Sequence, residues 1–262
     1  MEITDNFVIE KVGKIIDPNT KKNLAQTKSL KKAVVKEGDI SIEIVLGYPA
    51  RNYIETFKKS IEEDLAKEGI KNPSINISWE IETHSVQKSL KPMQNIKNII
   101  AIASGKGGVG KSTTAINLAL ALANEGANVG ILDADIYGPS QPRMMGLKGQ
   151  PDSEDGKTLQ PMENYGVQAM SIGFLIDEET PMIWRGPMVT QALEQLISDT
   201  NWRNIDYLVV DLPPGTGDVQ LTLAQKIPVS GAVIVTTPQD IALLDARKGL
   251  KMFEKVEVPV LG

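Results

Sequence analysis

Residues Gly105 to Ser112 form the segment whose residue types and spacing most clearly indicate chemistry, because they fit the pattern G-x-x-x-x-G-K-[ST]. Glycines let consecutive backbone N–H groups surround a polyphosphate, and a following helix adds its positive N-terminal end. We expect Lys111 to bind the β- and γ-phosphates and Ser112 to ligate Mg²⁺. A ligand-free glycine-rich turn is the alternative, but a strand-like segment before the loop and a helix-like segment after it favour a nucleotide. The predicted nucleotide-binding residues are Gly105, Lys106, Gly107, Gly108, Val109, Gly110, Lys111, Ser112 and Thr113.

Lys106 is the second residue of this loop. Its side chain cannot easily fold back onto the phosphates that its own loop binds. It could instead cross a dimer interface and neutralise charge on nucleotide bound by a second copy, as an arginine finger does. A solvent-exposed lysine without a role is the alternative, and the loop alone leaves both interpretations open.

Two acidic turns follow apolar segments: Asp133-Ala134-Asp135, and Asp211 before the run Leu212 to Asp218. Carboxylates at the carboxyl ends of parallel strands face the crevice in which such sheets bind ligands. We expect Asp211 to hold a magnesium-bound water and Asp135 to orient or deprotonate the attacking water. Capping of the next helix is the alternative for each aspartate. Gly215 and Gly217 give the second turn the backbone freedom of a γ-phosphate sensor, or simply form a tight turn.

The elements that must position these residues alternate between apolar strands and helices. Such near-continuous apolar strands indicate a mostly parallel sheet covered by helices on both faces. The predicted fold class is therefore α/β, a P-loop NTPase preceded by a small α+β domain. The expected strands are 98–104, 128–133, 207–211, 232–236 and 258–261, and the expected helices are 112–124, 189–197, 218–225 and 241–253.

The small α+β domain is expected from two alternating segments, 40–46 and 75–81, with a helix of amphipathic spacing at 53–67 between them. The segment from His84 to Lys97 is polar and contains Pro92, which is typical of a linker. The predicted organisation is a small domain at 1–83, a linker at 84–97 and a P-loop ATPase domain at 98–262.

Composition narrows the classes of function. The 262 residues are 41% hydrophobic and 23% charged, and no apolar run approaches the roughly 18 residues of a membrane span. The chain has no cysteine, which excludes disulfides and thiolate metal sites within it. Residues 1–97 carry 16 basic and 14 acidic side chains, and residues 98–262 carry 12 and 19. Because the lysines are scattered, neither nucleic acid nor membrane is an expected partner. No signal peptide is visible at the N-terminus, so a cytoplasmic location is expected.

Four segments together resemble the Mrp-type iron-sulfur cluster carrier ATPases, in the deviant-Walker-A class that also contains nitrogenase iron protein and the Min and Par ATPases. They are SGKGGVGKST at 104–113, ILDADIYGPS at 131–140, YLVVDLPPGTGD at 207–218 and VTTPQDIALLDARKGL at 235–250. Residues 1–83, with Ile16-Asp17-Pro18 and Leu46-Gly47-Tyr48-Pro49, more loosely resemble the small domain that often precedes this ATPase. Ala50 and Arg51 stand where that domain often has a cysteine, which argues against a metal role for it.

The resemblance implies roles for individual residues. Lys106 would be the signature lysine that reaches across a nucleotide-sandwich homodimer. Ser112 and Asp211 would organise magnesium, Asp133 would lie near the metal shell, and Asp135 would activate water. Residues 133–140 and 211–218 would be two switches that move when the γ-phosphate is lost.

The function implied is an ATP-binding and ATP-hydrolysing carrier that assembles iron-sulfur clusters and transfers them to apoproteins. ATP and Mg²⁺ would be its cofactors, and cluster scaffolds and apoproteins its partners. The family binds its cluster with a C-x-x-C pair beyond the last strand seen here, whereas this sequence ends at Gly262 without a cysteine. A truncated chain is the expected explanation, and an ATPase that has lost the cluster is the alternative.

Two other classes of function are alternatives. A Min- or Par-like positioning switch would carry a basic patch or a terminal amphipathic helix, and neither is visible. A metabolic kinase would need an acceptor pocket and no lysine acting in trans.

Overall fold

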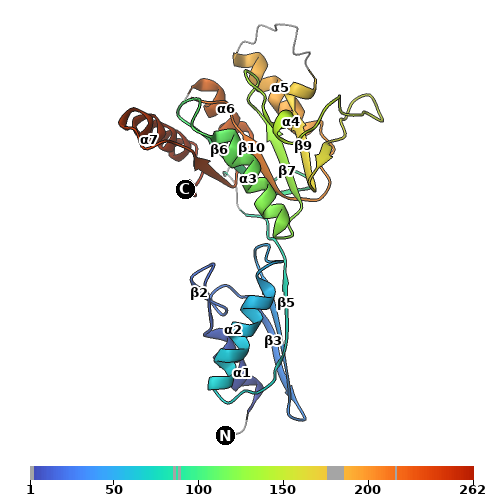
Figure 1. Cartoon of the computed structure of the whole chain (residues 1–262), viewed down its shortest axis with the longest axis vertical. Helices are drawn as coiled ribbons and strands as arrows, with labels where there is room; N and C mark the ends of the chain where they lie inside the picture. The colour runs from blue at the N-terminus through green and yellow to red at the C-terminus, as the bar shows by residue number, and fades with distance from the viewer. Residues whose placement is uncertain (1–2, 85–86, 88–89, 176–185, 216) are drawn as a thin grey trace. The chain divides into compact units, whose positions relative to one another are not determined.

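The computed structural model describes residues 3–84, 87, 90–175, 186–215 and 217–262, which are labelled by element in Figure 1. Two compact units divide the chain: Met1–Glu82 with Asn124–Gly126, and Thr83–Ala123 with Ala127–Gly262. Within the described ranges, no helix is both long enough and apolar enough to cross a membrane.

The N-terminal unit packs two helices against one face of a three-stranded sheet. Alternate residues of its central strand are buried, as expected for a strand with one solvated face. The buried side chains of Phe57, Ile61 and Leu65 on the second helix belong to the same core as Ile42 and Ile44 of that strand. The elements are α1 (Asp5–Gly13), β1 (Ile16–Asp17), β2 (Lys22–Asn23), β3 (Leu30–Lys36), β4 (Asp39–Leu46), α2 (Ile54–Lys67) and β5 (Ser74–Trp79), with sheet order β3-β4-β5.

The second unit is built on a six-stranded sheet of order β11-β6-β10-β7-β9-β8. Its first five strands in this order run parallel, and β8 pairs antiparallel with β9 at one edge. The mostly parallel sheet that the sequence predicts is therefore confirmed. The strands are β6 (Ile96–Ala103), β7 (Val129–Asp133), β8 (Met162–Asn164), β9 (Val167–Ser171), β10 (Ile205–Asp211) and β11 (Gly231–Ile234).

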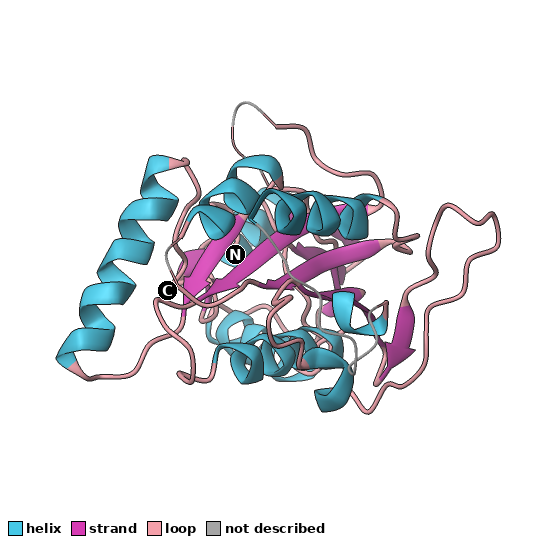
Figure 2. Cartoon of the chain, turned by 90° about the horizontal axis from the view of Figure 1, so that it is seen from above, coloured by secondary structure: helices cyan, strands magenta, loops and turns pink. Residues whose placement is uncertain are grey.

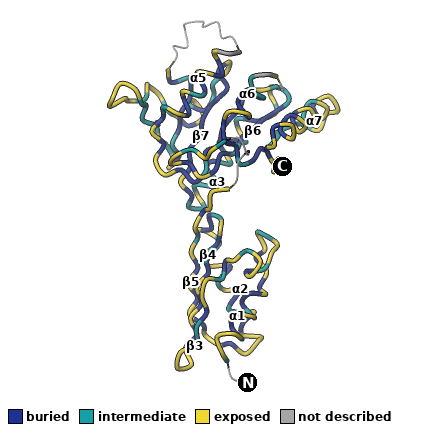
Figure 3. The backbone as a smooth tube through the Cα atoms, turned by 180° about the vertical axis from the view of Figure 1, so that it is seen from behind, coloured by how far each residue is buried: buried dark blue, intermediate teal, exposed yellow. Residues whose placement is uncertain are grey.

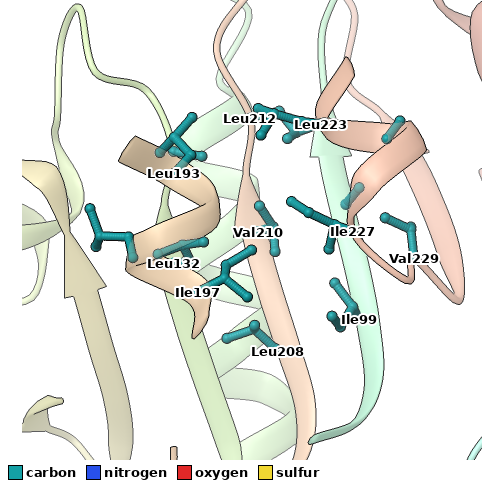
Figure 4. Close-up of a cluster of buried hydrophobic side chains, with 14 of the residues drawn as sticks. Ile99, Leu132, Leu193, Ile197, Leu208, Val210, Leu212, Leu223, Ile227 and Val229 are labelled. Carbon is teal, nitrogen blue, oxygen red and sulfur yellow. The ribbon is translucent and has the colours of Figure 1, made fainter. Parts of the chain in front are cut away.

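Helices cover both faces of this sheet (Figure 2). On one face, Leu193 and Ile197 of α5, Leu223 of α6 and Ile227 directly after α6 pack over the strands, as the close-up in Figure 4 shows. Burial is nearly continuous along the central strands, which are dark blue in Figure 3. The helices are α3 (Lys111–Asn124), α4 (Gln141–Met144), η1 (Ile172–Phe174), α5 (Gly186–Ser198), α6 (Asp218–Lys226) and α7 (Asp240–Lys255).

Several details differ from the expectation. Helix α1 and strands β1, β2 and β3 of the N-terminal unit were not expected, and neither were α4 and η1 of the second unit. Residues 258–261 form no strand, because they make only a single bridge between Val260 and Ala232. Strands β8 and β9 were not expected. Strand β6 begins at Ile96, inside the segment expected to be a linker, because Ile96 and Ile205 pair in the sheet.

The sheet brings the ends of three strands to one edge. Strand β10 lies between β6 and β7, and Asp211 is in register with both Asp133 and Ile102. The glycine-rich loop follows β6 directly. The loop and both acidic turns therefore meet at the carboxyl edge of the sheet, where parallel α/β sheets bind ligands.

Candidate nucleotide-binding site

The glycine-rich loop connects β6 to α3, which begins at Lys111. Gly108 and Gly110 have φ of +76° and +92°, a region that side chains other than glycine rarely adopt. A Cβ added at Gly107, Gly108 or Gly110 would meet no atom within 4 Å. The space beside these three glycines is therefore open, as a loop that binds phosphate requires.

Lys111 is the buried cation of the site, with 6% of its side chain exposed. Its Nζ lies 2.5 Å from Oδ1 of Asp211 and 3.8 Å from Oδ2 of Asp135. The same Nζ lies 3.3 Å from Oγ of Ser112. The structure thus brings together four of the predicted residues, and the lysine that would bind phosphate is here paired with a carboxylate.

Asp133 is fully buried and already accepts hydrogen bonds on both oxygens. Its Oδ1 accepts from N–H of Asp135 (3.1 Å), and its Oδ2 accepts from N–H of Ser140 (2.8 Å), N–H of Gln141 (3.0 Å) and Oγ of Ser171 (3.3 Å). Burial raises the pKa of Asp133 to about 7, against the lowering effect of the backbone donors. These contacts give Asp133 the task of shaping the loop 134–141, and its place near a metal shell stays a prediction.

Asp135 is the carboxylate with a free oxygen. Its Oδ1 is buried and has no hydrogen-bond partner among the described residues. Burial raises the pKa of Asp135, while the charge of Lys111 acts in the opposite direction. A buried carboxylate with one unused oxygen and a raised pKa has the chemistry of a general base.

Other buried oxygens beside the loop are also unsatisfied within the described chain: Oγ of Ser140 and Oε1 of Gln141. Buried polar atoms normally have partners, so unpartnered oxygens in one place indicate that a ligand or water belongs there. No group of three or more acidic, histidine or cysteine side chains suited to a metal exists in the described ranges. One or two carboxylates, a hydroxyl and phosphate oxygens are nevertheless what Mg²⁺ commonly takes.

Lys106 is half-buried, and its ammonium makes no ion pair or hydrogen bond with the residues that the structure describes. Only its backbone carbonyl is used, because it accepts from Oγ of Ser104 at 3.0 Å. Its side chain is therefore not committed to the site of its own chain. Of the second switch, Thr216 lies outside the described residues.

Gln141 is a site residue that the sequence analysis missed. It is 1% exposed, and its Nε2 donates to Oδ2 of Asp211 at 2.9 Å and to the carbonyl oxygen of Ser112 at 3.0 Å. Nothing in its spacing announces this role, because its two partners lie 29 and 70 residues away in the chain.

Comparison with known proteins shows to which family the chain belongs. Residues 95–262 match the ParA family model, described as NUBPL iron-transfer P-loop NTPase. The chain belongs to this NUBPL-type P-loop NTPase family. Residues 8–75 match a second model, described as iron-sulfur cluster assembly protein. The resemblance inferred from the motifs is confirmed for both parts of the chain.

Relatives of the NUBPL-type family bear names that agree with this. An iron-sulfur cluster carrier protein of Pseudomonas fragi is 61% identical over 197 residues, which are 74% of this chain and 69% of the relative. A protein of the same name from Salmonella typhimurium is 51% identical over 247 residues, 94% of this chain and 67% of the relative. The chain thus spans about two thirds of the length of these relatives.

A solved structure of similar fold is a nucleotide-binding protein from Archaeoglobus fulgidus in complex with ADP. It is 41% identical, with a TM-score of 0.56, and the match covers 64% of this chain and 65% of that one. The P-loop NTPase fold of the second unit is thereby confirmed.

In the N-terminal unit, the segment that contains Asp17 contacts the segment that contains Tyr48, and these are the two segments on which its looser resemblance rested. Asp17 is buried and accepts from N–H of Asn19 (3.0 Å), Oγ1 of Thr20 (3.2 Å) and the hydroxyl of Tyr48 (2.8 Å). Burial and the bond to Asp17 raise the pKa of Tyr48, which keeps its hydroxyl a donor. Ala50 is fully buried and offers no ligand atom.

Proposed function

We propose that this protein is an ATP-hydrolysing carrier that assembles iron-sulfur clusters and transfers them to apoproteins. The observation that carries the proposal is the meeting of Lys111, Ser112, Asp135 and Asp211 at an open glycine loop, in a chain of the NUBPL-type family. The names of the relatives support the cargo. The cluster is substrate, and because the chain contains no cysteine, its ligands are not cysteines of these 262 residues.

The loop N–H groups and Lys111 bind the phosphates of ATP. To do so, Lys111 exchanges its ion pair with Asp211 for the β- and γ-phosphates. The exchange frees an oxygen of Asp211, so that Asp211 and the hydroxyl of Ser112 are the groups that would hold Mg²⁺. When bound, Mg²⁺ would neutralise negative charge on the phosphates.

Asp135 orients the attacking water and accepts its proton. Its unpartnered Oδ1 is the acceptor that this step needs. Lys106, which has no partner within the described chain, completes the site of a second copy in a homodimer. Loss of the γ-phosphate then alters residues 133–140 and 211–218, and only a difference in cargo affinity between the two states can convert that into transfer. The carrier works in the cytoplasm with scaffold proteins as donors.

Lys111→Ala tests this proposal. The variant removes the charge that binds phosphate, so we expect both phosphate release and ATP-stimulated cluster transfer to fall to background. Both are measured anaerobically, with a cluster-loaded scaffold as donor and an apo-ferredoxin as acceptor. Lys148→Ala, at an exposed position, is the matched control and should retain both activities. Transfer that is equally fast with Lys111→Ala would contradict the carrier proposal, and unchanged phosphate release would contradict the site.

A further inference from the structure

Gln141 connects three segments that are far apart in the chain. Its backbone N–H donates to Asp133 at the end of β7, and its side-chain amide donates to the carbonyl of Ser112 in the first turn of α3. The same amide nitrogen donates to Asp211 at the end of β10. One buried side chain thus ties both acidic turns to the glycine loop.

The contact with Asp211 matters because of what else that carboxylate binds. Asp211 is fully buried, with Oδ1 paired to Lys111 at 2.5 Å and Oδ2 accepting from Gln141 at 2.9 Å. A buried carboxylate that loses its donors is strongly destabilised. When Lys111 moves to a phosphate, the amide of Gln141 is the side-chain donor that stays with Asp211 among the described residues.

We propose that Gln141 is a positioning residue that holds the Asp211 carboxylate in place while Lys111 exchanges from Asp211 to the nucleotide. This inference rests on the proposed function, since it requires that the loop binds nucleotide. Among the described residues, Gln141 forms no hydrogen bond with Lys111, and its side chain reaches the glycine loop at the carbonyl of Ser112. It acts through Asp211 and through the carbonyl of Ser112.

A second observation concerns the carbonyl oxygen of the same side-chain amide. Oε1 of Gln141 is buried and has no hydrogen-bond partner among the described residues. If the amide only filled space, an apolar side chain would avoid the cost of an unsatisfied buried polar group. The two hydrogen bonds of Nε2, one of them to a charged carboxylate, are the interactions that offset this cost.

The test measures binding of a fluorescent ADP analogue in EDTA, without Mg²⁺, so that only the exchange of Lys111 is probed. Gln141→Leu removes the amide, and Gln141→Met removes it with a side chain closer in length. We expect each variant to weaken binding about tenfold, the effect of losing one hydrogen bond to a charged group. Gln168→Leu is the matched control, because Nε2 of Gln168 also donates to a backbone carbonyl, that of Arg203, at 3.0 Å. It should bind within about twofold of the wild type.

A double-mutant cycle separates positioning from mere packing. In an Asp211→Asn background the carboxylate is gone and only the bond to the Ser112 carbonyl remains, so Gln141→Leu should weaken binding clearly less than it does in the wild-type background. Three results would each overturn the proposal. The first is an equal loss of affinity in both backgrounds, and the second is wild-type affinity of Gln141→Leu. The third is that neither Gln141 variant shows a cooperative melting transition, which would mean that neither folds. If the wild type itself binds no ADP analogue, the proposed function fails; if only the Gln141 effect is missing, that function stands.

Discussion

Asp133, Asp135 and Asp211 show how one residue type takes three environments at one edge of a sheet. Asp133 is enclosed by backbone donors, Asp211 is paired with Lys111, and Asp135 keeps an oxygen free. Motif spacing identifies all three aspartates but does not show which of them has an oxygen free to react. That depends on which backbone N–H groups of the following loop point toward each carboxylate. The distinction between a loop-shaping and a reacting carboxylate therefore comes from the structure.

Asp135→Asn tests the distinction. The amide keeps the shape of the side chain but cannot accept a proton from water, so kcat for ATP hydrolysis should fall about 100-fold or more. Nucleotide affinity should stay within about threefold, because Asp135 lies at 3.8 Å from Lys111 and is not its main partner. Phosphate-release kinetics and equilibrium binding measure the two separately. A variant that hydrolyses ATP at the wild-type rate would show that another group activates the water.

Gln141 marks the limit of prediction at the scale of residues. Lys111, Ser112 and Asp211 carry strong motif signals, since their spacing is fixed by one loop and one strand end. Gln141 works through contacts with three separate segments, and no local pattern encodes such contacts. A glutamine between a serine and a proline reads in sequence as an ordinary start of a short helix.

At the scale of elements, the long apolar strands and the long helices of the second unit were predictable, whereas its short edge strands and, in the N-terminal unit, α1 and β3 were not. Strands β6, β7, β10 and β11 and helices α3, α5, α6 and α7 all overlap the segments expected from periodicity. Strand β8 has three residues and β9 reads Val-Gln-Ala-Met-Ser, too short and too mixed for a clear period. Residues 167–171 form a strand because they pair with β7, which is a tertiary contact that local sequence does not encode.

Helix α7 approaches the glycine loop so closely that only glycine fits at Gly105. A Cβ there would lie 2.5 Å from Cβ of Asp245 and 2.7 Å from its backbone carbon. We expect Gly105→Ala to displace α7 and to lower the free energy of unfolding by about 2 kcal/mol, or roughly 5 °C in melting temperature. Gly107→Ala is the comparison, because its Cβ would meet nothing within 4 Å.

Gly107→Ala should keep the wild-type melting temperature, because its Cβ occupies open space, and we expect it to weaken nucleotide binding instead, because Gly107 lies in the proposed phosphate-binding loop. Thermal unfolding and ADP binding of both variants provide the measurement. If the two variants melt alike, the close approach of α7 does not constrain Gly105.

At the scale of the whole molecule, the chain combines two family models in two compact units. The NUBPL-type unit contains every residue that we assign to ATP. The N-terminal unit contains the buried carboxylate of Asp17 with its hydrogen-bond donors, and its described residues include no cysteine or histidine. We therefore assign energy conversion to the second unit. Our proposal that a second copy completes the site starts from Lys106, whose ammonium has no partner among the described residues.

The most direct test of this account is the ATPase rate of mixed dimers in which one chain carries Lys106→Ala and the other Asp135→Asn. The two variants are co-expressed with different tags and purified through both. Each variant as a homodimer should bind nucleotide but hydrolyse almost no ATP. In the mixed dimer, the chain with intact Asp135 receives Lys106 from its partner, so one of two sites is complete and about half of the wild-type rate should return. A mixed dimer as inactive as its parents, or no co-purified dimer at all, would contradict the account.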